Sequence, residues 1–314
     1  MVRTIAWIVI GAFAGAALMF WLVGERWRLM RRSTWAGMRA QGLRNMLNGK
    51  ALHMYIYGCW TNQYAKYYLL GWLCRRMDPR RAKRLTDHYH GKVLTHDHAE
   101  AIVGLDHDIP LQDLEQIIPY ATARDLVLNG PPDVAALECC CRHARAEPCQ
   151  PTQVCMIIGQ PFVDFILEHR PSDARRLSQS EALELLDQER ERGHVHTAWF
   201  KDVMLNRFYA ICNCCKCCCG GIEAMRLGAP MLDSSGYVAV LHDSLCVGCA
   251  SCVKACPFDA LSLDEKITTL DWEKCMGCGV CVGQCSKGAI SLVLDERKGI
   301  PFDVRTLAGE EAAV

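Results

Sequence analysis

The first stretch of the chain is a continuous apolar run. Residues 5–24 (IAWIVIGAFAGAALMFWLVG) include no charged side chain over 20 positions, and a helix needs about 20 apolar residues to span a bilayer. Trp7 and Trp21 lie near the ends of this run, where aromatic side chains gather at membrane interfaces. The pattern therefore predicts a transmembrane anchor over residues 1–24.

Basic residues are placed unevenly around the apolar run. Only Arg3 precedes it, whereas Arg26, Arg28, Arg31 and Arg32 follow within eight residues. By the positive-inside rule the larger C-terminal part then lies in the cytoplasm. We therefore expect a single-pass protein of the inner (cytoplasmic) membrane. A cleaved signal peptide is the alternative, but its positive charges would precede the apolar segment.

The juxtamembrane region, residues 25–86, is basic and irregular. Residues 25–50 carry seven Lys or Arg side chains among apolar positions, which predicts a basic amphipathic helix along the membrane surface. A solvated helix face explains the same pattern. Residues 52–74 are apolar but include Asn62 and Lys66. A buried or interfacial aromatic helix is therefore expected there, rather than a second span.

Helical signals dominate the middle of the chain. Thr95 is a predicted N-cap, and Ser178 with Glu181 forms a predicted capping box for a helix over residues 178–192. Residues 111–130 have a helical apolar period, followed by a second expected helix that ends at an Asn–Gly pair. We therefore expect a mainly helical middle domain.

Four histidines are spaced in alternation near the start of this domain, namely His88, His90, His96 and His98. Alternate spacing brings two side chains to one face only in a strand, and the helix expected after Thr95 does not meet that condition. A metal-ligand role therefore competes with ordinary surface histidines.

Cysteine is the unusual component of the composition, with 21 residues in a chain of 314. The count is odd, and the cysteines stand in C-x2-C, C-x-C and CC groups. Such groups are poorly placed for internal pairing and well placed to converge on a metal. We therefore expect reduced thiols in a reducing compartment rather than a disulfide framework.

Overall charge and other motifs exclude some classes of function. The chain has 35 basic and 35 acidic residues, so it has no bias toward nucleic acid, and no nucleic-acid partner is expected. The sequence contains neither a G-x-G-x-x-G fingerprint nor a P-loop. Metal chemistry is the feature that remains.

Eleven cysteines occupy the middle of the chain, too many for one site. Thiolate pairs on two loops are what a four-thiolate zinc site or an iron–sulfur cube requires. Three interpretations stay open: an additional iron–sulfur cluster, structural zinc, and redox-active or unliganded buried thiols. The candidate ligands are Cys139, Cys141, Cys149, Cys155, Cys212, Cys214, Cys215, Cys217 and Cys218.

An internal cysteine repeat marks the last third of the chain. CVGCASCVKAC (246–256) and CMGCGVCVGQC (275–285) share C-x2-C-x2-C-x3-C spacing, which is typical of 4Fe–4S clusters in bacterial ferredoxins. Three closely spaced thiolates hold one cube, and the fourth cysteine reaches the other. Short strands are expected over residues 260–263 and 289–292. The spacing assigns cluster I to Cys246, Cys249, Cys252 and Cys285, and cluster II to Cys275, Cys278, Cys281 and Cys256.

Residues 89–294 resemble a group of bacterial and archaeal 4Fe–4S dicluster-domain proteins. The matching phrases are YHGKVL (89–94), LEQIIPYATARDLVL (114–128), the C-x-C-R of 139–142, PCQPTQVC (148–155), GHVHTAW (193–199), ICNCCKCCCG (211–220) and both repeats. The resemblance implies iron–sulfur electron transfer with redox partner proteins and supplies no substrate. The chain departs from the group at Cys140, at Ser286 in place of a proline, and in its N-terminal anchor.

These patterns predict an α+β chain that combines one membrane helix with two metal-binding domains. Its parts are a transmembrane anchor (1–24), juxtamembrane helices (25–86), a mainly helical cysteine-rich domain with an additional metal site (87–235), a ferredoxin-like domain with two 4Fe–4S clusters (236–296) and a C-terminal tail (297–314). The leading interpretation is a membrane-anchored protein that passes single electrons between redox partners through two clusters and a third metal centre. The alternatives are an electron-input subunit of an oxidoreductase with thiol- or cluster-based catalysis, and a non-catalytic redox or metal sensor.

Overall fold

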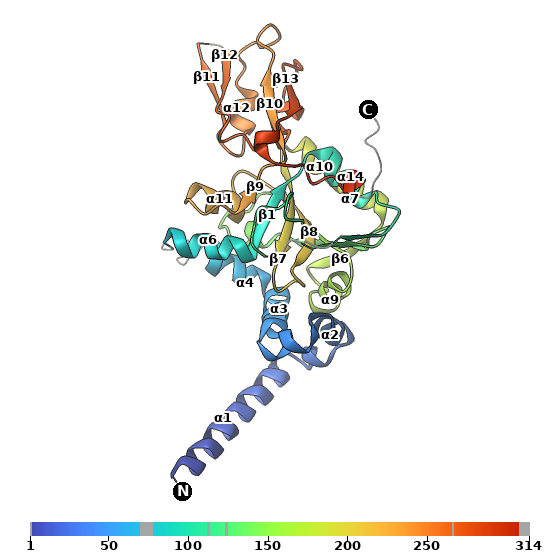
Figure 1. Ribbon diagram of the computed structural model, residues 1–314, viewed down its shortest axis with the longest axis vertical. Helices are drawn as coiled ribbons and strands as arrows, with labels where there is room; N and C mark the ends of the chain where they lie inside the picture. Colours follow the sequence, from blue (N-terminus) through green and yellow to red (C-terminus); the bar gives the residue numbers. More distant parts are fainter. Residues whose placement is uncertain (1, 70–77, 112–113, 123–124, 266, 308–314) are drawn as a thin grey trace.

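The computed structural model describes residues 2–69, 78–111, 114–122, 125–265 and 267–307. Helix α1 (Val2–Gly24) extends from one end of the molecule, and the ferredoxin-like domain lies at the opposite end (Figure 1). A sheet domain lies between them. The last part of the aromatic helix expected over residues 52–74 falls outside the described residues, as does the end of the C-terminal tail.

The middle domain is built on a seven-stranded sheet with strand order β6-β4-β5-β8-β7-β1-β9. All neighbours are antiparallel except β1 and β9, which pair in parallel. The strands are β1 (Tyr89–Val93), β4 (Val134–Glu138), β5 (Gln153–Ile158), β6 (Ala174–Leu177), β7 (Val195–Lys201), β8 (Arg207–Cys214) and β9 (Leu232–Asp233). The mainly helical middle domain expected from the sequence is therefore not confirmed.

Short apolar runs explain this difference. The segment VHTAWFK of β7 is buried at every position, and such a run does not reveal by periodicity alone whether it is strand or helix. The helix expected to end near residue 130 is wrong, because β3 (Leu126–Leu128) pairs there with β2 (Ile109–Leu111). Local apolar spacing was overridden by pairing between distant strands.

Capping chemistry predicted the starts of two helices in this domain. The Thr95 side chain caps α7 (His96–Val103), accepting a hydrogen bond from the backbone of His98. The capping box of Ser178 and Glu181 starts α10 (Gln179–Glu191). Both predictions are confirmed. The other helices of the domain and its flanks are α6 (Pro79–His88), α8 (Cys140–His143), α9 (Phe162–His169), α11 (Gly220–Arg226) and α14 (Val304–Leu307).

The juxtamembrane region packs on the sheet domain through α2 (Arg32–Leu47). Thr34 Oγ1 lies 2.7 Å from His169 Nε2, and the Ser33 amide donates to Glu168 over 3.1 Å. The expected amphipathic helix is interrupted, because Gly42 has φ of 75° inside α2. The remaining elements are η1 (Arg28–Met30), α3 (Lys50–Cys59), α4 (Thr61–Tyr64) and the π-helical turn η2 (Ala65–Leu69).

The ferredoxin-like domain has its own small core and two two-stranded sheets. The strands β10 (Tyr237–Leu241) and β13 (Ile290–Leu294) join its beginning to its end, while β11 (Leu261–Asp264) pairs with β12 (Ile267–Leu270). The two strands expected after the cysteine repeats are confirmed as β11 and β13, each starting one residue later than expected. Helices α12 (Ser251–Ala255) and α13 (Val280–Gly283) each carry the chain between the third and fourth cysteine of a repeat, and η3 (Glu296–Lys298) follows β13.

Candidate metal centres

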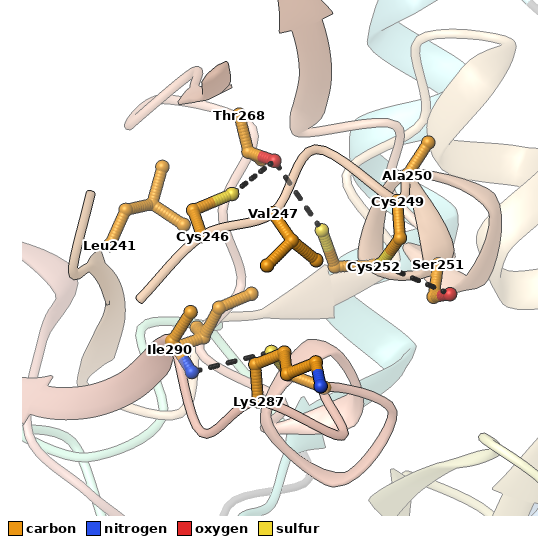
Figure 2. Close-up of a pocket in the computed structure, with 12 residues that line it drawn as sticks. Leu241, Cys246, Val247, Cys249, Ala250, Ser251, Cys252, Thr268, Lys287 and Ile290 are labelled. Atoms are coloured by element: carbon orange, nitrogen blue, oxygen red, sulfur yellow. Dashed lines mark hydrogen bonds between the residues drawn. The ribbon is translucent and has the colours of Figure 1, made fainter. Parts of the chain in front are cut away.

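The first cysteine-lined pocket of the ferredoxin-like domain opens onto about 370 Å³ of space and is lined by Cys246, Cys249, Cys252 and Cys285. In Figure 2 the Thr268 hydroxyl points between two of these sulfurs, 3.6 Å from Cys246 Sγ and 3.8 Å from Cys252 Sγ. The Gly248 amide and the Thr268 hydroxyl lower the pKa of Cys246. The thiolate, which is the form that binds metal, is thereby favoured.

The second pocket of this domain opens onto about 340 Å³ and is lined by Cys256, Cys275, Cys278 and Cys281. Burial and the neighbouring sulfurs of Cys275 and Cys256 raise the pKa of Cys281 to about 12. Several thiolates in one apolar pocket repel each other, and a bound cation relieves this repulsion. The backbone is also close here: a Cβ at position 277 (φ +62°) would lie 2.2 Å from Tyr237 O, so glycine is required.

Each of these two pockets combines three cysteines of one repeat with the fourth cysteine of the other. The division is the one that the spacing predicts, and ligation of clusters I and II by these eight residues stays a prediction. The course of the backbone explains why the fourth cysteine of each repeat lies in the pocket of the other repeat. Short helices α12 and α13 follow the first two cysteines of each repeat and end before the fourth cysteine. They therefore carry the chain from one pocket to the other.

A third cysteine-lined pocket lies in the middle domain and opens onto about 440 Å³. The sheet builds it: Cys155 lies on β5, and Cys212 and Cys214 lie on the adjacent β8. Alternate residues of a strand face the same side, so the C-x-C spacing presents both thiols to one pocket. Eight cysteines line it, namely Cys139, Cys140, Cys141, Cys155, Cys212, Cys214, Cys215 and Cys219.

Nine candidate ligands were predicted from the sequence, and six of them line this third pocket. Cys149, Cys217 and Cys218 are the three that do not line it. Cys140 and Cys219 line it although they were not among the candidates. Their adjacency to Cys139, Cys141 and Cys218 was the available signal, but only the fold decides which thiols of a CC group face the same side.

Arg142 is a fully buried cation in the wall of the third pocket. Its Nη2 lies 3.1 Å from Glu189 Oε2 and 3.2 Å from the backbone oxygen of Asn213. Burial alone would lower the pKa of Arg142, but the charges of Cys215 and Glu189 outweigh it and raise the pKa. Its Nε has no hydrogen-bond partner among the described residues. A buried N–H without a partner is costly, and this one belongs to a residue that lines the cysteine pocket.

The thiols of the third pocket are in contact with one another. Cys214 Sγ and Cys219 Sγ are 3.1 Å apart. A hydrogen bond with Cys141, opposed by one with Cys155, and burial together raise the pKa of Cys139 to about 12. Without a bound cation the ionised form of Cys139 is therefore disfavoured. Binding a metal here releases protons.

The cluster II pocket faces the middle domain. Met276, which lines that pocket, is buried in the same apolar core as Cys139 and Cys214. Polar contacts fix the junction: Ser235 Oγ donates to Gly277 O over 2.8 Å, and Lys216 Nζ lies 2.7 Å from Asp259 Oδ1. In the cluster I pocket, by contrast, Cys249 is exposed.

The histidine pairs do not converge on a shared site. His90 is buried and its Nδ1 contacts the backbone oxygen of Thr86, while His98 Nε2 lies 3.5 Å from Asp303. His88 Nδ1 lies 3.4 Å from Asp202, and His96 Nε2 lies 3.2 Å from Asp187 and 3.5 Å from Glu100.

The pockets and the fold of the C-terminal part define a ferredoxin-type iron–sulfur domain. Residues 245–289 match the 4Fe–4S dicluster domain family. A stretch of 57 residues is 35% identical to one subunit of the ion-translocating oxidoreductase complex of Haemophilus ducreyi. That match covers 15% of this chain and 28% of the relative, so the chain spans about a quarter of the relative's length. The family match does not extend to the middle cysteines.

The N-terminal helix is the one described helix long and apolar enough to cross a membrane, over Ile5–Val23. Its side chains pack against little else, and Trp7, Phe13 and Phe20 are exposed. An exposed apolar surface of this length is unfavourable in water.

Proposed function

We propose that this protein is a membrane-anchored electron-transfer protein. It transfers single electrons through two 4Fe–4S clusters in the ferredoxin-like domain and a third iron–sulfur cluster in the middle domain. Redox proteins are its partners, and the body of the molecule is cytoplasmic. The observation that carries the proposal is the presence of three cysteine-lined pockets of similar size in one chain.

The two ferredoxin pockets provide an internal standard for the third. They open onto about 370 and 340 Å³, and each is lined by four cysteines. The third opens onto about 440 Å³ and is lined by eight. Thiol sulfur is the ligand of iron–sulfur clusters. The third pocket therefore resembles the two ferredoxin pockets in extent and offers more than the four cysteines that a cluster needs.

The walls of the third pocket also fit a cluster. The unpartnered Arg142 Nε–H is a donor for a cluster or cysteine sulfur, and hydrogen bonds to sulfur are one means by which a protein sets a cluster's potential. Tyr89 and Trp199 line the same pocket and limit the access of water. A bound cluster supplies reversible one-electron chemistry; the residues supply its ligands, a positive charge and a dry surrounding.

The arrangement of the pockets supports electron transfer along the long axis of the molecule. The cluster II pocket packs against the middle domain, whereas the cluster I pocket includes the exposed Cys249. An external redox partner therefore has its best access at cluster I. The membrane helix lies at the far end from this access point (Figure 1).

Iron and sulfide analysis of the whole protein tests the third cluster. Protein purified anaerobically in detergent is expected to contain about twelve irons per chain, which corresponds to three 4Fe–4S clusters. Electron paramagnetic resonance of the reduced protein is expected to show more than two interacting centres. A value of about eight irons, with sulfide in proportion, would limit the protein to the ferredoxin pair.

Removal of residues 2–24 tests the membrane anchor. The full chain is expected to stay in the membrane fraction after alkaline carbonate washing, because a spanning helix is not released by breaking electrostatic contacts. The shortened chain is expected in the soluble fraction with the same iron content. Release of the full chain by carbonate would contradict the anchor.

A second candidate function is that of an electron-input subunit in a larger oxidoreductase. The similarity to a component of an ion-translocating oxidoreductase complex favours it. Co-purification of a stoichiometric partner with the anaerobically solubilised protein would support this role, and a protein isolated alone from its native membrane would count against it.

A further inference from the structure

The three middle cysteines that do not line the third pocket, Cys149, Cys217 and Cys218, form a group with Cys215, which does line it. Cys149 comes from the loop between α8 and β5, and its partners come from the turn between β8 and α11. The sulfurs of Cys149, Cys215 and Cys217 all lie within 4.8 Å of one another. Cys217 Sγ lies 3.4 Å from Cys218 Sγ, and Cys218 is also in side-chain contact with Cys215.

We propose that Cys149, Cys215, Cys217 and Cys218 bind a single zinc ion beside the third pocket, with Cys215 in the shared wall and the other seven pocket cysteines left for the iron–sulfur cluster. Zinc in closed structural sites is tetrahedral, with zinc–sulfur bonds of about 2.3 Å, so its thiolates lie roughly 3.8 Å apart. The sulfurs of Cys149, Cys215 and Cys217, which all lie within 4.8 Å of one another, and the 3.4 Å separation between Cys217 and Cys218 are close to that spacing. Four thiolates from two loops make a closed site with no open position for a substrate.

The spacing distinguishes this group from a cluster site. A 4Fe–4S cluster separates its four cysteine sulfurs by the width of the cube, whereas one ion draws them together. The sulfurs of Cys149, Cys215 and Cys217 all lie within 4.8 Å of one another. Among the described residues, no three of the eight ferredoxin cysteines have sulfurs this close together. The same structure therefore contains both spacings, and this group has the narrow one.

Neighbouring groups support the sulfurs as they do in zinc sites. The Cys149 amide donates to Cys218 Sγ over 3.5 Å, and His194 Nε2 lies 3.8 Å from Cys149 Sγ. The other nitrogen of His194 lies 2.6 Å from the buried carboxylate of Glu189. A carboxylate and a histidine behind a metal ligand are a common outer shell, which fixes the orientation of the ligand.

The zinc site would hold the junction between the two metal-binding domains. Lys216, within the ligand turn, contacts Asp259 and the backbone oxygen of Lys254 in the ferredoxin-like domain. An ion that ties this turn to Cys149 fixes the position of Lys216. We therefore assign the site a structural role, keeping the cluster II pocket against the middle domain.

Parallel zinc and iron analysis of the full chain tests this inference. Wild-type protein is expected to contain about one zinc per chain in addition to its iron. Cys217→Ser is expected to lower zinc at least about fivefold and to leave iron unchanged, because a closed site needs all its thiolates. Cys217 is exposed, so its replacement by serine is compatible with folding. Cys149→Ser is the second variant and is expected to behave in the same way.

The matched control is Cys59→Ser, a partly buried cysteine that lines none of the three cysteine-lined pockets; it should change neither metal. Wild-type protein without zinc would overturn the inference. A loss of iron instead of zinc in Cys217→Ser would also overturn it, because these thiols would then be cluster ligands. Zinc and iron are counted in the same sample, so failure of the zinc site and failure of the third cluster are distinguishable.

Discussion

Replacing Cys256 and Cys275 together by serine is expected to remove no more iron than replacing either residue alone. These cysteines come from different repeats, yet both line the cluster II pocket. Cys256 and Cys275 are both close enough to Cys281 for their charges to raise its pKa. If both are ligands of one cluster, either replacement costs about four irons per chain and the second costs little more.

The contrasting double variant joins Cys246 to Cys275. These residues line different pockets, so their combined replacement is expected to remove about eight irons. In a double-mutant cycle, the effects of two replacements add when the sites are independent and do not add when both residues belong to one site. Iron and sulfide per chain, measured on anaerobic protein, give the answer. The opposite result would be a loss of about eight irons in the double variant of Cys256 and Cys275, and of about four in the double variant of Cys256 and Cys246. Each repeat would then hold one cluster with its own four cysteines.

The ferredoxin-like domain was predictable from sequence because its site is local. Cys246, Cys249 and Cys252 wrap one pocket within seven residues, and their spacing alone fixes which thiols converge. The short helices α12 and α13, which contain the third cysteine of each repeat, then bring the fourth cysteine to the other pocket. The Thr95 N-cap and the Ser178–Glu181 capping box are equally local, and both predictions are confirmed.

The middle domain was less predictable because its pocket depends on distant pairing. Cys155 reaches Cys212 only through the alignment of β5 with β8, where Met156 pairs with Ile211. The sequence shows which cysteines are close together along the chain, but it does not show which residues of β5 and β8 lie opposite each other. Only the fold therefore shows that Cys149, Cys217 and Cys218 lie outside the pocket and that Cys215 belongs to both groups.

The fold also explains why a sheet is suited to this middle site. Strand residues hold their side chains at fixed separations on one face, and the sheet is bounded by a buried Arg142–Glu189 pair. Replacing one partner of a buried ion pair typically costs about 3–5 kcal/mol. The pair thus places a buried positive charge, compensated by Glu189, in the wall of the cysteine pocket.

Replacing Cys155 by serine is expected to lower the iron content from about twelve to about eight per chain. Cys155 is fully inside the third pocket, and its thiol is in hydrogen-bonding contact with those of Cys139 and Cys212. Loss of this central thiolate removes one ligand and leaves a hydroxyl that binds iron poorly. The ferredoxin signal in electron paramagnetic resonance is expected to persist, because the cluster I and II pockets are lined by other cysteines.

Two controls make this prediction specific to the third pocket. Cys59→Ser, which changes a partly buried cysteine outside all three pockets, should keep about twelve irons. Cys155→Ala removes the hydroxyl as well and should match Cys155→Ser, which excludes residual binding through oxygen. Zinc should stay near the wild-type value in both Cys155 variants, since Cys155 is not part of the Cys149 group. Unchanged iron in the Cys155 variants, with the protein folded, would mean that the third pocket holds no iron–sulfur cluster that depends on Cys155.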